Sequence, residues 1–274
     1  MNNFNLVRGL YTSAFIVLLV ISNVSAQWST KGPYGGSVSA ITVSDTTVFV
    51  ASPSGGVYKS TNSTASAWQY VNYTGMSSGK ITSLSSIGRV IVAGSEDKGI
   101  FLSRNNGTTW ETGNAGLGIL NISALTVSQG KIFAGTNGAG VFMSSDSGLT
   151  WTFANIGLSS LTITALTSSA GALLAGTFDG GIFISSDNGN SWVEANSGLL
   201  NLHVNTIAVS ALTIFAGTND GVFTASAISP VWSLSTSGMI TTAVNALLAN
   251  GSLLFAGTDA GIFSSSDSGL NWVS

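Results

Sequence analysis

The carboxylates that stand close to glycine at the turns of the chain are its clearest candidates for chemistry. Asp97, Asp179, Asp220 and Asp259 each precede a glycine by one or two residues, and Asn137 stands in a similar segment. Two carboxylates roughly 5 to 10 Å apart in a groove can hydrolyse a glycosidic bond, one as the acid and the other as base or nucleophile. Asp179 and Asp220 are the candidate catalytic residues on this hypothesis. Aspartate and asparagine also favour tight turns for backbone reasons alone, so the favoured interpretation is that the five residues build turns and form a candidate binding face.

The sequence gives little support to other catalytic or metal-binding chemistry. His203 is the only histidine and cysteine is absent, so a metal site with several histidine or cysteine ligands cannot be built. The serines lack the Gly-x-Ser-x-Gly pattern of a nucleophile elbow, and no glycine-rich phosphate loop leads from a strand into a helix. We therefore predict no metal and no cofactor. Glu194 and His203 are expected near the face that holds these aspartates, and His203 is interpreted as a surface residue.

The first 26 residues have the pattern of a secretory signal peptide. Arg8 precedes an apolar run from Leu10 to Ile21, and Val24-Ser25-Ala26 ends in the small residues that precede a cleavage site. An uncleaved membrane anchor is the alternative, but the run of 12 residues falls short of the ~20 that span a bilayer. We expect a mature chain of residues 27–274 that is secreted, whether to the periplasm, the cell surface or the medium.

Charge narrows the range of partners. Without Arg8 the chain has 7 basic and 11 acidic side chains, a net charge of −4. Proteins that bind nucleic acid or an anionic membrane usually present a basic surface. We therefore expect neither partner.

Tryptophan reveals an internal repeat. The seven tryptophans stand 40 to 42 residues apart, and the segments between them align as six copies of a unit of about 41 residues; they are Trp28, Trp68, Trp110, Trp151, Trp192, Trp232 and Trp272. Each copy contains three short runs rich in Ile, Val, Leu, Phe and Thr, and a fourth run starts at the tryptophan. The runs are separated by Gly, Asn, Asp or Ser, which predicts strands joined by tight turns, as at Phe178-Asp179-Gly180-Gly181.

The repeat predicts an all-β fold, a β-propeller of six four-stranded blades. One four-stranded unit of this length buries little surface alone, and radial stacking of the units protects their edges. Seven blades are the alternative count, and a linear β-solenoid is the alternative architecture. The chain ends at Trp272-Val273-Ser274, inside an expected outer strand. Either the strand around Trp28 closes the ring, or a longer protein continues with another blade or domain.

An octapeptide pattern ends in the tryptophan of four copies. It reads SSDSGLTW, SSDNGNSW and SSDSGLNW in three copies, and SRNNGTTW in a fourth where Asn105 replaces the aspartate. These segments resemble the Asp-box, or bacterial neuraminidase repeat, Ser-x-Asp-x-Gly-x-x-Trp. The matching residues are Ser103, Asn105, Gly107 and Trp110; Ser144, Asp146, Gly148 and Trp151; Ser185, Asp187, Gly189 and Trp192; and Ser265, Asp267, Gly269 and Trp272. The copies that end in Trp68 and Trp232 lack the aspartate and glycine, so we expect differently built turns there.

The boxes are interpreted as structural elements. An aspartate in a turn between the third and fourth strands can accept backbone N–H groups, and the glycine can adopt a conformation that a Cβ would oppose. Among Asp-box proteins, the resemblance to sialidases would imply three arginines that clamp a carboxylate. Only Arg89 and Arg104 remain after removal of the signal peptide, and Arg104 lies inside a box. Sialidase activity is therefore argued against.

The resemblance extends to xyloglucan-degrading propellers, photosystem assembly-factor propellers and sortilin-type receptors, and it implies a fold more than an activity. We predict a secreted, non-enzymatic propeller that binds or scaffolds an extracellular protein or glycan. The alternative is a glycoside hydrolase of the xyloglucanase type. Loops of the pattern Asn-x-Gly-Leu, at 114–117, 155–158 and 196–199, are a predicted contact surface. Their leucines Leu117, Leu158 and Leu199, with Met239, are alternatively predicted to pack between blades.

Overall fold

The computed structural model describes residues 37–274 except 54–55, 62–66, 72–74, 77–78, 170 and 240–242. The described residues form 23 strands, in agreement with the predicted all-β fold. None of them belongs to a helix long and apolar enough to cross a membrane. The predicted signal peptide and the strand expected around Trp28 lie outside the described residues.

Six antiparallel sheets follow one another along the chain, and within each the strands are hydrogen-bonded in sequence order. Blade one contains β1 (Ala40–Ser44), β2 (Thr47–Ser52), β3 (Gly56–Ser60) and β4 (Gln69–Tyr70). Blade two contains β5 (Ile81–Ile87), β6 (Val90–Ser95), β7 (Ile100–Ser103) and β8 (Glu111–Thr112). Blade three contains β9 (Ile122–Ser128), β10 (Lys131–Thr136), β11 (Val141–Ser144) and β12 (Thr152–Phe153).

The second half of the chain repeats this arrangement. Blade four contains β13 (Ile163–Ser169), β14 (Ala172–Thr177), β15 (Ile182–Ser185) and β16 (Val193–Glu194). Blade five contains β17 (Val204–Ser210), β18 (Thr213–Thr218), β19 (Gly221–Ser226) and β20 (Ser233–Leu234). Blade six contains β21 (Val244–Asn250), β22 (Leu253–Thr258) and β23 (Gly261–Ser265), and a bridge between Ser264 and Val273 marks the place of its fourth strand. The predicted six-bladed β-propeller is confirmed.

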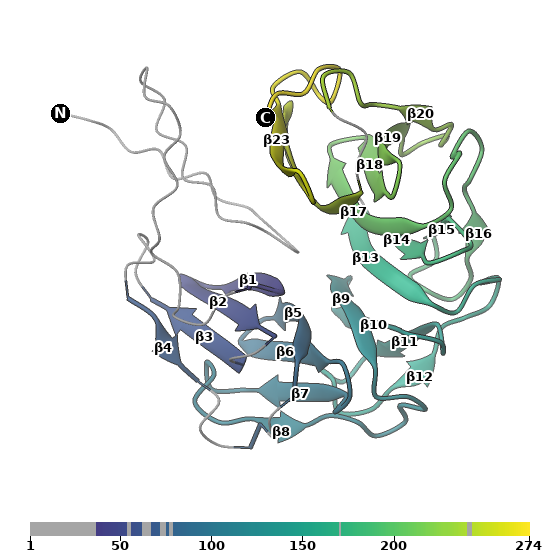
Figure 1. Ribbon diagram of the computed structural model, residues 1–274. Helices are drawn as coiled ribbons and strands as arrows, with labels where there is room; N and C mark the ends of the chain where they lie inside the picture. The colour runs from purple at the N-terminus through teal and green to yellow at the C-terminus, as the bar shows by residue number, and fades with distance from the viewer. Residues whose placement is uncertain are drawn as a thin grey trace.

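The first strand of each blade lies at the centre of the propeller. Figure 1 shows the blades in order around an arc, from the purple blade one to the yellow blade six. Each first strand packs against the next, in the series β1, β5, β9, β13, β17 and β21, whereas β21 and β1 are not a packed pair. Within the described residues the arc therefore has two open ends.

The hydrophobic core lies between the blades. Five clusters of buried side chains occur, one between each pair of consecutive blades. Between blades three and four, for example, Phe133 meets Leu166 and Trp192. Because each cluster needs side chains from two blades, a single blade has little core of its own.

Glycines on the second strands let the blades approach closely. A Cβ placed on Gly94, Gly135, Gly176 or Gly217 would lie 2.5 to 2.7 Å from a side-chain carbon of the residue that opens the first strand of the next blade. We call each such glycine a seat and its partner a knob; the four knobs are Ile122, Ile163, Val204 and Val244. The knobs and seats fix the spacing of the blades at the centre of the propeller.

A second set of contacts joins the first strands directly. In blades two to six the second residue of the first strand lies in a β-bulge, which turns its side chain out of the regular ladder. Thr82 Oγ1 donates to the backbone oxygen of Ile122 at 2.5 Å, and Ser123 Oγ donates to that of Ile163 at 2.5 Å. Blades five and six carry asparagine at this position.

The fourth strands begin one residue later than predicted. Each has two residues and follows the tryptophan, as in Trp192 before β16. The tryptophan side chain turns inward to the layer between blades, so the residues that follow it form the edge strand of the sheet.

Candidate functional site

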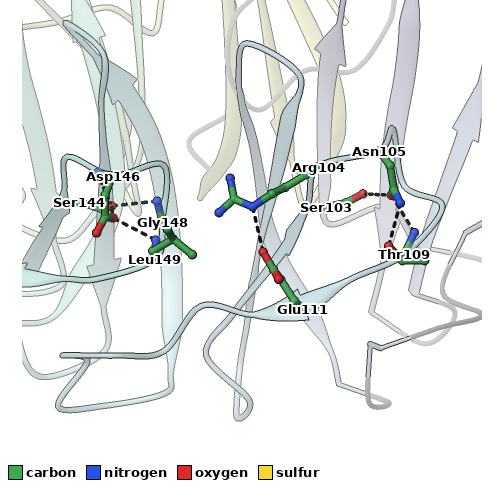
Figure 2. Close-up of polar contacts among 9 residues, drawn as sticks. All are labelled: Ser103, Arg104, Asn105, Thr109, Glu111, Ser144, Asp146, Gly148 and Leu149. Carbon is green, nitrogen blue, oxygen red and sulfur yellow. Dashed lines mark hydrogen bonds and ion pairs between the residues drawn. The ribbon is translucent and has the colours of Figure 1, made fainter.

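The Asp-box turns join the third and fourth strands at one end of the blades. In the third blade, Asp146 Oδ1 accepts hydrogen bonds from the backbone N of Leu149 at 3.0 Å and of Thr150 at 2.9 Å, as well as from Ser144 Oγ at 2.8 Å. Gly148 N donates to Ser144 Oγ at 2.8 Å (Figure 2). Ser147 and Gly148 have φ of 61° and 89°, the left-handed conformation for which the motif needs glycine. The carboxylate of Asp146 thus holds the turn together.

In blade two, the uncharged side chain of Asn105 holds the turn in the same way. Its Oδ1 accepts from Thr109 N at 2.8 Å, and its Nδ2 donates to Thr109 Oγ1 at 2.8 Å (Figure 2). Beside this turn the only arginine inside a box, Arg104, forms an exposed ion pair with Glu111 at 2.9 Å. The turn therefore forms equally with asparagine in place of the aspartate.

The three Asp-box aspartates make the stability of the fold depend on pH in the acid range. Hydrogen bonds, first those from the side chain of the residue four positions later, lower the pKa of Asp146, Asp187 and Asp267 from 3.8 to about 2. A carboxyl with a lower pKa in the folded state stabilises the fold above its unfolded pKa, and this stabilisation is lost as the pH falls through the folded pKa. We expect the urea midpoint to fall between pH 4 and pH 2.

The triple variant Asp146→Asn, Asp187→Asn, Asp267→Asn provides the comparison. It should fold at pH 7, as the Asn105 turn indicates, and its urea midpoint should change less between pH 4 and pH 2. Equal pH dependence of the two proteins would contradict the assignment.

Each Asp-box tryptophan links two blades. Trp192 is buried, and its Nε1 donates to the backbone oxygen of Ala154 in blade three at 2.8 Å. Trp110, Trp151, Trp232 and Trp272 make the equivalent bond to the preceding blade at 2.6 to 2.9 Å. Trp232 keeps this contact although its segment lacks the Asp-box residues. The prediction of a differently built turn agrees with the longer third strand there, β19.

The residues of the candidate binding face all lie in hairpins between the second and third strands. Asp97, Asp179 and Asp220 stand two residues after the end of the second strand, whereas Asn137 and Asp259 stand one residue after it. Their positions are therefore similar but not equivalent in each blade, and the hairpins themselves differ, since those of blades five and six have two residues only. We call this end of the propeller, opposite the Asp-boxes, the hairpin face.

The two candidate catalytic aspartates are held by neighbouring side chains. Asp179 Oδ1 accepts from Ser160 Oγ at 2.5 Å, and Asp220 Oδ2 accepts from Asn201 Nδ2 at 2.7 Å. Asp259 is bound in the same manner by Asn245 at 2.7 Å, and Asp97 pairs with Lys98 at 3.5 Å. Among the described residues no group of three or more His, Cys, Asp or Glu side chains is placed to hold a metal ion.

The Asn-x-Gly-Leu loops have a structural role. Asn155 Oδ1 accepts from Val141 N at 2.7 Å and its Nδ2 donates to the backbone oxygen of Ala139 at 2.9 Å; Asn114 and Asn196 hold their hairpins in the same way. Leu199 and Met239 are buried, and Leu117 and Leu158 pack against the clusters between blades. The packing interpretation thus describes these side chains better than the contact-surface interpretation.

Apolar side chains gather on the hairpin face beside the predicted aspartates. Phe178, 52% exposed, contacts the ring of His203 with 4.2 Å between centroids. Leu202 is 40% exposed, its backbone oxygen accepts from Gly181 N at 3.0 Å, and Leu200 beside it is exposed. We call Phe178, Leu200, Leu202 and His203 the apolar patch; Phe178 stands in the hairpin that carries Asp179, and the other three stand in the loop that leads from blade four to blade five.

Sequence reasoning missed this patch. Leu120, Leu161 and Leu202 stand two residues before the first strands of blades three, four and five, 41 residues apart, and each is about 40% exposed. An apolar residue repeated just outside a strand was the signal available in the sequence. The contact of Phe178 with His203 joins two blades, so no pattern within a single repeat predicts it.

Charge is unevenly distributed over the propeller. No lysine or arginine follows Lys131, whereas seven of the 11 acidic residues do, three of them in the hairpins of blades four to six. The neighbourhood of the apolar patch therefore carries negative charge without a lysine or arginine from its own blades. Such a surface disfavours strongly anionic ligands.

Comparison with known proteins supports the propeller and leaves its activity open. A family model described as the DUF6242 beta propeller domain matches residues 88–204, less than half of the chain. Comparison with curated proteins finds no match.

Solved structures share the fold at low sequence identity. The GH74 xyloglucanase from Xanthomonas campestris is 14% identical with a TM-score of 0.68, over 83% of this chain and 43% of the enzyme. YCF48 from Cyanidioschyzon merolae is 11% identical with a TM-score of 0.63, over 85% and 83% of the two chains. PorZ, a surface component of the type-IX secretion system of Porphyromonas gingivalis, is 12% identical with a TM-score of 0.68, over 91% and 43%. This chain thus spans less than half of the xyloglucanase and of PorZ, and the similarity concerns the fold alone.

Proposed function

We propose that this β-propeller is a secreted, non-enzymatic binding module and that its hairpin face contacts an extracellular protein or glycan. The observation that carries the proposal is the apolar patch. Exposed phenylalanine and leucine side chains cost solvation free energy unless a partner covers them, and a patch rimmed by polar groups is typical of a binding surface. Phe178 and His203 offer flat faces, and Asp179 and Asp220 each keep a second carboxylate oxygen that can accept a hydrogen bond from a ligand.

The rigidity of the face supports binding. The hairpins are tied to the following loops by backbone bonds such as Gly140 N to Leu161 O at 2.8 Å, and by the asparagine side chains described above. A surface that is already ordered loses little conformational entropy when a partner binds. The contacts of Asp179 with Ser160 and of Asp220 with Asn201 are those of turn residues, which favours binding over hydrolysis.

The test compares two matched variants of the mature chain. Phe178→Ala removes the exposed ring of the apolar patch, and Phe153→Ala removes an exposed ring from the outer strand β12 of blade three, outside the apolar patch. Binding to immobilised xyloglucan, β-glucan, mucin and proteins from the culture medium is measured for both. We expect Phe178→Ala to weaken any binding by about tenfold, the loss typical of a central contact residue, and Phe153→Ala to leave it unchanged.

Two outcomes would count against the proposal. Equal loss in both variants, or no binding by the native chain to any of these probes, removes the assignment of the hairpin face. Turnover of β-glucans or aryl glycosides that disappears in Asp179→Asn or Asp220→Asn would replace the binding module by a hydrolase.

A further inference from the structure

Among the described residues, one seat of the propeller has no knob. In blade six, Gly257 occupies the position of Gly94, Gly135, Gly176 and Gly217, but of the described residues only Ala246 of its own blade lies within 4 Å of the place of a Cβ. On the third strand next to it, Ile262 pairs with Gly257 and is 37% exposed, whereas its counterparts Ile182 and Val222 are fully buried. The outward side of blade six thus presents the surface that is covered in blades one to five.

The other end of the arc shows the complementary half of the same contact. Val38 stands before Ser39 and Ala40 at the position that the knobs occupy in the other blades, and it is 40% exposed. Toward blade two this strand is joined normally, since Ser39 Oγ donates to the backbone oxygen of Ile81 at 2.6 Å. Blade one therefore has a knob without a seat, and blade six has a seat without a knob.

We propose that the open ends of the arc form a docking site for one further blade. The occupant is a four-stranded antiparallel β-sheet whose first strand opens with valine or isoleucine, which fills the seat at Gly257, and whose second strand carries a glycine that receives Val38. One contact between blades is repeated along the chain. The chain makes it four times with the same residue types, so the uncovered copies at the two ends select a partner with those same features.

Asparagine in place of a hydroxyl does not prevent such docking. Asn245 of blade six occupies the position from which Thr82 and Ser123 reach the next blade, and its Nδ2 binds Asp259 instead. Asn205 of blade five is likewise turned toward Asn219, yet blade six packs against blade five through Val244 and Gly217. The hydroxyl bond is therefore not required for two blades to pack together.

The experiment adds the proposed further blade to the same chain. Ser274 aligns with Glu194 and Leu234, so a second copy of Ala195–Leu234 placed after Ser274 continues the repeat and brings its own Val204 and Gly217. The melting temperature of the extended mature chain should rise by at least about 2 to 4 °C, the shift that one modest interface gives in a domain of this size. Amide hydrogen exchange in β21 and β22 should slow.

Two variants test whether the gain comes from the proposed contact. Gly257→Val fills the seat, and because only Ala246 is near, it should leave the melting temperature of the unextended chain unchanged. In the extended chain Gly257→Val, or Val204→Asp in the added copy alone, should abolish the gain and the slower exchange. A gain that survives both variants, or no gain at all, overturns the proposal.

The unextended chain distinguishes the other occupants. If Val38→Cys and Gly257→Cys in one molecule form a disulfide without extension, blade one closes the ring itself. If light scattering finds dimers that Gly257→Val dissociates, a second copy covers the face. Either result overturns a docking site for a further blade and leaves the proposed binding function of the hairpin face untouched.

Discussion

Trp192→Ala is expected to lower the free energy of unfolding by about 3 to 5 kcal/mol, the range for loss of a large buried aromatic side chain. The indole lies in the layer between blades three and four with Phe133 and Leu166. The substitution leaves a cavity there, and it also leaves the backbone oxygen of Ala154 without its donor. An unsatisfied buried acceptor adds to the cost of the cavity.

Urea denaturation followed by circular dichroism measures this effect. Trp192→Phe retains most of the buried ring but removes the N–H, so its smaller loss reports the hydrogen bond and the remaining volume. Val193→Ala, at the adjacent exposed position of β16, should change the free energy of unfolding by less than about 0.5 kcal/mol. A loss of similar size in Val193→Ala and Trp192→Ala would refute the layer between blades as the source of stability.

Gly157→Ala is expected to cost about 2 to 5 kcal/mol, because two penalties of about 1 to 2 and 1 to 3 kcal/mol combine. Gly157 has φ of 89°, a left-handed conformation that a Cβ disfavours. The Cβ would also overlap the backbone oxygen of Trp192 in the next blade. That oxygen belongs to the backbone of a residue whose side chain is buried between blades, so it cannot move aside as the end of a flexible side chain would.

A matched glycine separates the two penalties. Gly130 has φ of 76° and no atom within 4 Å of the place of a Cβ. Gly130→Ala therefore carries the conformational cost alone and should lose about 1 to 2 kcal/mol. Thermal or urea unfolding of both variants gives the difference, and equal losses would mean that the close approach to Trp192 contributes nothing.

The repeat made most of the fold predictable. Alternation of β-branched and aromatic residues with turn residues placed the strands, and the spacing of tryptophan gave the number of blades. The start of the fourth strands was misplaced by one residue, because Trp192 and its equivalents serve the layer between blades and not the edge of the sheet. The stacking of the blades decides which side of a residue faces a neighbouring blade. The sequence of a single repeat does not contain this information.

The candidate site was predictable only in part. Turn chemistry located Asp179 and Asp220 in hairpins correctly. It could not show that Ser160 and Asn201 bind them, since each partner comes from a loop 19 residues away. Leu199 and Leu202 look alike in the sequence, yet one is buried and the other exposed, because only the first turns into the layer between blades.

The confinement of lysine and arginine to residues up to 131 also governs how the protein is degraded. Proteases of the trypsin type cut only after these two residues, so the segment 132–274 offers them no cleavage site whether folded or unfolded. Blades four, five and six, with most of blade three, are therefore resistant to this class of enzyme by composition and not by folding stability. Cleavage by such proteases is restricted to sites from Arg8 to Lys131, at the start of the third blade or before it.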